Sequence, residues 1–337
     1  MTAAADALAA PARTTTSRRP VGRIVARRLL QVPVVLLIVS AAVFWLVQVV
    51  PGDPGRAALG QFATDEQVAL WKAENGLDGS TAERYLAWLG GFVTGDWGTS
   101  LAYGVPVRGL VAERFLNSVL LGLYAFVIVA VVGIALGLFQ AFRQGRRSDR
   151  SITVTMVSLS STPEFAVGTV LLVVFAVFLG WFPVHSGIPE GAGVPARLTV
   201  MTLPAITLAA ASVGYVARMA RAGTIETLEA PHYRTAVLKG LPRRRVLTAH
   251  VTRNSLVPSV AVLGNQLAYL VGGSIVVETL FSYPGIGLTI VEAVQKKDLV
   301  LLEAAIMLTA VASILVLLVT DLVSMALDPR IDLSQKA

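Results

Sequence analysis

Hydrophobic residues in this chain of 337 residues are gathered into long runs separated by polar segments. About 20 apolar residues in a helix are enough to cross the roughly 30 Å hydrocarbon core of a bilayer. Two of the runs contain a single acid, Glu164 in the third and Glu303 in the sixth, and the others contain no charge. The pattern therefore predicts an all-α membrane protein with six transmembrane helices, at residues 29–50, 115–142, 151–189, 198–217, 254–277 and 299–320.

The composition leads to the same class of protein. Hydrophobic residues make up 55% of the chain and charged residues 15%, whereas a soluble domain carries about 25% charged residues. This excludes an ordinary soluble enzyme. The first run is too long, and lies too far from the start, to be a signal-peptide core, so we expect it to be retained. The chain has no cysteine, which excludes disulfides, thiolate catalysis and zinc–thiolate sites.

Lysine and arginine are distributed unevenly over the polar segments. Of the 28 basic residues, 20 lie in the two tails (1–28 and 326–337) and in segments 143–150 and 218–253, and eight lie in the alternate segments. Basic residues accumulate on the cytoplasmic side of membrane proteins, so we expect both termini in the cytoplasm. The net charge of +7 is then explained by topology, and it gives no reason to expect a nucleic-acid partner.

The segment 51–114 is too long for a simple connection and carries signals for local helices on the outer side. Gly76 would end the first of these helices, and the second would reach about Val93. Each begins with a capping box, formed by Thr64 with Gln67 and by Ser80 with Glu83. Tryptophans favour the membrane interface, and this segment contains Trp71, Trp88 and Trp97. We expect a helical insertion packed against the outer face of the membrane.

The cytoplasmic loop 218–254 carries a clear helix stop. Lys239 in a last turn, Gly240 just beyond it and Pro242 further on predict a short helix that ends in a left-handed residue. Such a helix would lie across the cytoplasmic face between two spans. It could be a solvated basic loop, or it could dock a cytoplasmic protein.

At this loop the chain resembles a known family. Arg234-Thr235-Ala236-x-x-x-Gly240 is similar to the EAA loop of permease subunits in ATP-binding-cassette (ABC) importers, and in particular to the B-type permeases of dipeptide, oligopeptide and nickel systems. Further segments agree in order and position over about residues 23–332: Pro51-Gly52-Asp53-Pro54, Gly95-Asp96-Trp97-Gly98-Thr99-Ser100, Gly273 to Thr279, Phe281 to Gly287, and Leu327-Asp328-Pro329-Arg330.

The resemblance implies a fold, partners and a location. The fold is that of a type I ABC importer permease, with the core of helices 2–6 within residues 115–325. The partners are a second homologous permease, two cytoplasmic ABC ATPase subunits or domains, an extracytoplasmic solute-binding protein and membrane lipid. The location is the inner or plasma membrane of a bacterium. The chain lacks a phosphate-binding Gly-x4-Gly-Lys-Ser/Thr loop, so ATP and magnesium would be used by the partner subunits and no cofactor by this chain. The cargo would be peptides, with nickel, glutathione or another small solute as the alternative.

Three groups of candidate site residues follow. The docking helix offers the ATPase-coupling residues Tyr233, Arg234, Thr235, Ala236, Gly240, Leu241, Pro242 and Arg243. The candidate pore-lining residues are Glu164, Asn265, Gln266, Gly273 and Ser274, because polar groups in a span face the bundle interior or water. Each could instead be structural, through helix packing or hydrogen bonds. Glu164 is expected near the middle of the membrane, and Pro163 should bend the third span just before it. Candidate contacts with the binding protein are Asp53, Trp97, Pro284 and Gly285, although Asp53 could simply cap its own backbone.

Two other functions are less well supported. An intramembrane enzyme would need a catalytic group in the spans, but His185, His232 and His250 lie in predicted loops, and the intramembrane acids differ in depth. A passive channel would not need a docking helix. We therefore favour an importer subunit without a catalytic or metal site of its own.

Overall fold

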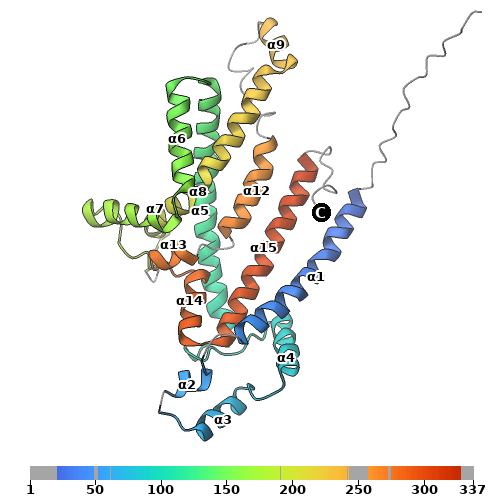
Figure 1. Ribbon diagram of the computed structural model, residues 1–337, viewed down its shortest axis with the longest axis vertical. Helices are drawn as coiled ribbons and strands as arrows, with labels where there is room; N and C mark the ends of the chain where they lie inside the picture. Colours follow the sequence, from blue (N-terminus) through green and yellow to red (C-terminus); the bar gives the residue numbers. More distant parts are fainter. Residues whose placement is uncertain are drawn as a thin grey trace, which may run out of the picture.

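The computed structural model describes residues 21–48, 52–60, 62–189, 191–240, 242, 257–271 and 275–327. Within these ranges the regular secondary structure is helical, apart from one isolated bridge between Thr99 and Pro106, and loops and turns connect the helices. Figure 1 shows a long bundle with α9 at one end and α2, α3 and α4 at the other. The helices are α1 (Val21–Gln48), α2 (Pro54–Leu59), α3 (Asp65–Glu74), α4 (Thr81–Thr94), α5 (Val107–Phe142), α6 (Arg147–Ser161), α7 (Glu164–Leu171), the π-helix η1 (Leu172–Phe178), α8 (Val194–Glu229), α9 (Pro231–Leu238), α12 (Val257–Val271), α13 (Ile275–Leu280), α14 (Ile286–Lys296) and α15 (Leu299–Leu327).

Four described helices are long and apolar enough to cross a membrane: α1 from Leu30, α5, α8 and α15 through Val323. A fifth crossing is possible if the bent pair α6 and α7–η1 forms one span. The described part of the fifth predicted span, α12, has 15 residues. The described residues therefore support a multi-pass membrane protein, while the count of six spans stays a prediction.

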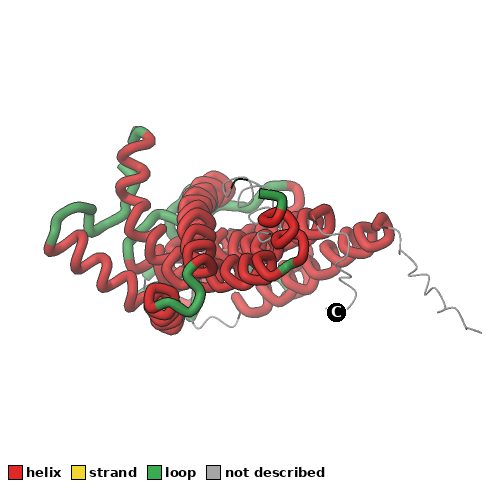
Figure 2. Tube along the Cα trace, turned by 90° about the horizontal axis from the view of Figure 1, so that it is seen from above, coloured by secondary structure: helices red, strands yellow, loops and turns green. Residues whose placement is uncertain are grey.

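The third predicted span is not one straight helix. α6 ends at Ser161, and α7 begins at Glu164 in a direction that differs by 107°. Pro163 lies in the break, where it cannot donate a backbone hydrogen bond and favours an extended residue before it. The bend predicted at Pro163 is confirmed, and the crossing of the membrane by segment 151–189 as one span stays a prediction. In both views a helical arm formed by α7 and η1 projects from the side of the bundle (Figures 1 and 2).

The centre of the bundle is the pair α5 and α8, which pack along much of their length. Glycines on α5 allow the close approach. A Cβ atom at Gly137 would lie 2.5 Å from the carbonyl oxygen of Ala217, and one at Gly133 would lie 3.0 Å from the Cβ of Val216. Small residues at such a crossing let two backbones approach closely, which is how helices associate within a membrane. α5 begins at Val107 rather than at residue 115, so it takes in the end of the predicted outer segment.

The outer segment has the predicted helices. Both capping boxes are present, at Thr64 for α3 and at Ser80 for α4, and Gly76 and Gly95 adopt positive φ angles just beyond the two helices. These predictions are confirmed. A row of aromatic rings connects α1 to α4 and to the following loop, namely Phe44, Tyr85, Trp88, Phe92 and Trp97. The row fixes the insertion against the first membrane helix.

One helix was not predicted. The turn at Pro284 and Gly285, which contains candidate contacts with the binding protein, leads directly into α14. Hydrophobic residues at helical spacing, at Ile286, Ile290 and Ala293, would have indicated this helix. α14 packs against α15 and α5, and it adds a helix to the end of the bundle that carries α2, α3 and α4.

Candidate functional site

The predicted docking helix is α9, which follows α8 after a single extended residue, Ala230. It lies at the end of the molecule opposite α2–α4 (Figure 1). Gly240 follows it with φ +67°, and no atom lies within 4 Å of the position where a Cβ would be. The predicted left-handed conformation of Gly240 is confirmed. A side chain at this position would be disfavoured by the positive φ angle and not by contact with neighbouring atoms.

The predicted ATPase-coupling residues lie in α9 and in the segment that follows it, and only some of them are among the described residues. The Thr235 hydroxyl donates to the carbonyl oxygen of Pro231 at 3.0 Å, and Tyr233 is half-buried. Pro242 is described, but it belongs to no helix. Leu241 and Arg243 lie outside the described residues, as do the side chains of Arg234 and Ala236. Attachment of an ATPase here remains a prediction.

A salt bridge that the sequence analysis missed lies close to this end. Arg221 of α8 donates from Nε and from a terminal nitrogen to the two carboxylate oxygens of Asp149, both at 2.9 Å. Asp149 is 3% exposed, and it also accepts from the backbone N–H of Gly145 at 3.0 Å and from the Gln140 amide at 3.4 Å. The contacts join the α5–α6 connection to α8. Asp149 is the only acid in the basic segment 143–150, which is a signal that could have been noticed.

Three candidate pore-lining residues are described in the middle of the bundle. The Gln266 amide oxygen accepts from the Ser212 hydroxyl of α8 at 2.8 Å, while Asn265 is exposed. The Tyr269 hydroxyl of α12 donates to the Glu164 carboxylate at the start of α7. Tyr269 was not predicted. Gly273 and Ser274 lie outside the described residues.

The outer turn before α14 is built on a buried acid, Glu278, which is 1% exposed. Its carboxylate accepts from the Ser118 hydroxyl at 2.6 Å and from the N–H groups of Gly287 and Leu288 at 2.7 and 3.1 Å. A carboxylate at the N-terminus of a helix satisfies N–H groups that have no partner within the helix. Glu278 therefore fixes the start of α14.

Two of the predicted binding-protein contacts belong to this turn. The carbonyl oxygen of Pro284 accepts from the Asn117 amide at 2.9 Å. Gly285 is buried, and a Cβ there would lie 2.5 Å from the Ser118 hydroxyl oxygen and as close to the Glu278 carboxylate. Only a residue without a side chain fits at this position.

Asp53 caps α2, as the alternative interpretation of its turn expected. One carboxylate oxygen accepts from the Gly55 N–H at 2.9 Å, and the other accepts from Lys72 of α3 at 2.6 Å. The hydrogen bond from Lys72 lowers the pKa of the Asp53 carboxyl below its usual value. Asp53 thus joins α2 to α3, and its contact with a binding protein stays a prediction.

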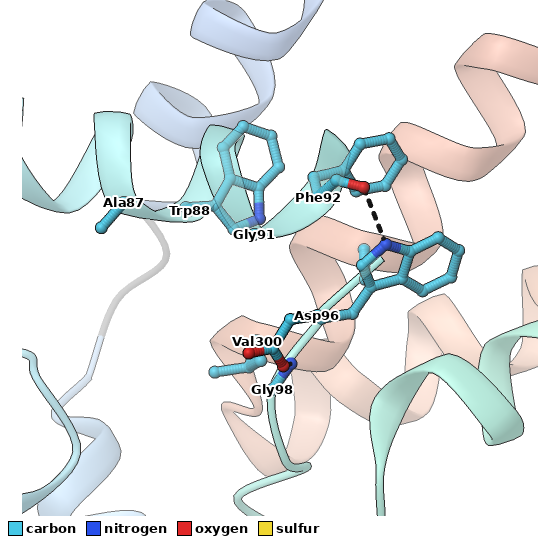
Figure 3. A pocket seen from close by; sticks show the side chains of 9 residues that line it. Ala87, Trp88, Gly91, Phe92, Asp96, Gly98 and Val300 are labelled. Carbon is cyan, nitrogen blue, oxygen red and sulfur yellow. Dashed lines mark hydrogen bonds between the residues drawn. The ribbon is translucent and has the colours of Figure 1, made fainter. Parts of the chain in front are cut away.

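Trp97 lines a pocket of about 180 Å³ between α4 and α15, shown in Figure 3. Its ring stacks on Phe92 at a centroid distance of 5.1 Å, and its indole nitrogen donates to the Phe92 carbonyl oxygen at 3.1 Å, the dashed line in the figure. The other lining residues are Ala87, Trp88, Gly91, Asp96, Gly98, Val300 and Ala304. Trp97 is partly buried, so it fixes the loop after α4 against α15.

That loop is joined to α15 by a second buried acid. Asp298 is 0% exposed, and it accepts from the Ser100 hydroxyl, from the Ala102 N–H at 3.0 Å and from the Leu301 N–H at 3.1 Å. The outer loops are therefore held by two buried carboxylates, Glu278 and Asp298. Among the described residues, no group of three or more His, Cys, Asp or Glu side chains is placed to bind a metal ion.

Comparison with known proteins gives a consistent family. The model of the binding-protein-dependent transport system inner membrane component matches residues 133–333, and the model of the N-terminal part of such membrane components matches residues 21–110. The chain is similar to a probable peptide ABC transporter permease protein of Sinorhizobium fredii, with 31% identity over 92% of this chain and 99% of that protein.

It is also similar to the glutathione transport system permease protein GsiC of Escherichia coli K12, with 35% identity over 91% of this chain and 98% of that protein. The GsiC protein of Shigella dysenteriae gives the same values. The matches extend over the membrane helices and the outer segment alike. The chain therefore belongs to the inner membrane components of binding-protein-dependent transport systems, the permease subunits of ABC importers of the dipeptide and oligopeptide family.

Proposed function

We propose that this chain forms half of the translocation pore of an ATP-driven importer, together with a second, homologous permease subunit. Two cytoplasmic ABC ATPase subunits or domains bind and hydrolyse ATP with magnesium, and an extracytoplasmic binding protein delivers the cargo. The observation that carries the proposal is α9, a short helix that is presented at the end of α8 and is followed by the left-handed Gly240. A helix in this position offers a surface on which a separate motor can act.

The proposed topology has six spans, with both termini in the cytoplasm. α2, α3 and α4 then lie on the extracytoplasmic side, since α9 and these helices are at opposite ends of the bundle (Figure 1). The arm α7–η1 supports the presence of a second permease. It projects from this chain with exposed apolar side chains, including Phe165, Val170, Val177 and Phe178. A neighbouring subunit would cover such a surface.

We assign Glu164, Asn265, Gln266, Gly273 and Ser274 to the neighbourhood of the pore. On the outer face, Asp53 and Pro284 remain candidate contacts with the binding protein. Trp97 and Gly285 would act beneath that face, because they pack against other parts of this chain. In this arrangement the binding protein would meet loops whose shape is fixed by Glu278 and Asp298.

The proposed cargo is a short peptide, and glutathione is the second candidate. The first follows from the similarity to the peptide permease of Sinorhizobium fredii, and the second from the similarity to GsiC. Glutathione is itself a tripeptide with a free amino group and two carboxylates, so one type of path could accept both.

Transport by the complete complex tests the function. The two permeases and the ATPases are reconstituted in liposomes with the binding protein, and uptake of labelled tri-alanine and of labelled glutathione is measured. We expect uptake of at least one that needs ATP and the binding protein, and that stops with a non-hydrolysable ATP analogue. Uptake that persists without ATP would instead indicate a passive channel. A complex that hydrolyses ATP without moving either compound would contradict the cargo assignment.

A further inference from the structure

Two polar side chains of α12 are exposed in this chain, one helical turn apart. Asn265 is exposed, and Tyr269 is 52% exposed. The neighbouring row of α12 faces the bundle, since Val262 and Leu270 are buried and Gln266 bonds to Ser212. An amide with no partner in hydrocarbon is costly, so the exposed row is expected to face water or protein rather than lipid.

Glu164 meets this row close to the middle of the membrane. Its depth can be estimated from α8, whose charged residues Arg197 and Arg218 are 21 positions apart, or about 31 Å. This matches the roughly 30 Å thickness of the hydrocarbon core. Ser160 donates to the carbonyl oxygen of Ala211 at 3.2 Å, and a Cβ at Gly168 would lie 3.0 Å from Thr207. Glu164, between Ser160 and Gly168, is therefore level with the middle of that stretch.

The hydrogen bond from Tyr269 places the carboxylate at the edge of the exposed row. A carboxylate has about four acceptor sites, so it can take the phenol and further donors at the same time. A primary ammonium group supplies three donors and the opposite charge. The Glu164–Tyr269 pair thus has the chemistry to receive a cation that passes along α12.

We propose that Glu164, positioned by Tyr269, is a cation-selecting group on the translocation path and accepts the free amino terminus of a passing peptide. The inference rests on the proposed function, since it requires α12 to face the path. It names the chemical feature of the cargo that this subunit recognises, an ammonium group. Asn265, one turn nearer the cytoplasm, continues the same polar surface.

The absence of cysteine from the chain allows a direct test. Asn265→Cys is introduced into the whole importer complex in detergent, and its rates of modification by cationic and anionic methanethiosulfonate reagents are compared with those of a free thiol. A carboxylate close to the new thiol attracts the cationic reagent and repels the anionic one. Together the two effects predict that modification by the cationic reagent is favoured by about ten-fold over modification by the anionic one. Val131→Cys on α5 is the control, because Val131 is also exposed, at 64%, but lies in an apolar helix. We expect it to react with neither reagent.

Two second-site variants identify the source of the preference. Glu164→Gln should reduce the preference at Asn265→Cys to about that of the free thiol. Tyr269→Phe keeps the carboxylate but removes the hydrogen bond that positions it, so it should reduce the preference only in part. An unreactive Asn265→Cys would overturn the exposure of this row to water. A preference that survives Glu164→Gln, or that is lost equally in both variants, would overturn the role of the Glu164 charge. Co-purification of the ATPase with the Asn265→Cys complex is measured separately. Failure of the proposed function would appear as loss of the ATPase, and it is thereby distinguished from failure of the role of Glu164.

Discussion

Arg221 and Asp149 form a two-pronged salt bridge that joins α8 to the connection between α5 and α6, ten positions before α9 begins. Because Asp149 is nearly fully buried, its charge depends on this partner. The pair fixes the end of the helix from which the proposed ATPase-docking surface extends. Loss of the salt bridge should therefore change both the thermal stability of the complex and the stimulation of ATP hydrolysis by cargo.

Arg221→Gln should leave the Asp149 carboxylate buried without its cation. Removing one partner of a fully buried pair costs about 3–5 kcal/mol, and because the Arg221 side chain is 30% exposed we expect a smaller loss of about 1–3 kcal/mol. It should appear as a fall in the melting temperature of the purified complex and as reduced cargo-stimulated ATP hydrolysis. Asp149→Asn combined with Arg221→Gln should recover part of the loss, since no buried charge then remains. Arg150→Gln, an exposed neighbour, is the control. Equal effects of the single and double variants would contradict this account.

Gly240→Val should weaken attachment of the ATPase without preventing membrane insertion. The left-handed conformation costs a residue with a side chain about 1–2 kcal/mol, and a β-branched residue fits it least well. Co-purification of the ATPase and cargo-stimulated hydrolysis measure the effect. Gly104→Val is a matched control, because Gly104 has φ +65° with no atom near the Cβ position but lies on the outer loop. The prediction fails if the two variants behave alike.

Gly285→Ala should destabilise the outer end of the bundle. The new methyl group would displace Ser118 or Glu278, and overpacking of this kind costs about 1–3 kcal/mol. The melting temperature of the complex measures this cost, and unfolding is monitored as the loss of solubility in detergent on heating. Gly109→Ala in α5 meets no atom within 4 Å and serves as the control. A melting temperature that is unchanged in Gly285→Ala would show that the turn before α14 is looser than its hydrogen bonds indicate.

Ala82→Cys tests the side of the membrane on which α4 lies. Ala82 is exposed, and its side chain takes no part in the capping box of Ser80 and Glu83, so the replacement leaves those hydrogen bonds intact. An impermeant maleimide should label it in spheroplasts, whose outer envelope has been opened. Lys239→Cys, at the α9 end, should react only after the membrane is permeabilised. The opposite result for the pair would reverse the proposed topology.

Local signals in the sequence predicted the local structure well. The capping boxes at Thr64 and Ser80, the bend at Pro163 and the left-handed Gly240 each depend on a few adjacent residues, and each is confirmed. The size of the 107° turn could not be predicted in the same way. It depends on what α7 packs against, namely α8 and α13.

The buried acids were missed for a related reason. Glu278 bonds to Ser118, 160 positions away, and Asp298 bonds to Ser100, 198 positions away. No local pattern shows that a polar residue will find a partner so distant in the chain. For Glu164 the sequence predicts a depth and a bend, and the structure adds the neighbour, Tyr269. Candidate positions along the chain could thus be named from the sequence, while the pairs between helices could not.

α8 continues without interruption for 36 residues from Val194 to Glu229, just before α9, although it contains Pro204. Its length is about 54 Å, so a tilt of about 5° around Val194 would move α9 by about 5 Å. Arg221 joins the same helix to α5 and α6, which would move with it. α8 therefore has the geometry of a lever arm, in which a small rotation at one membrane surface becomes a displacement of several ångströms at the other.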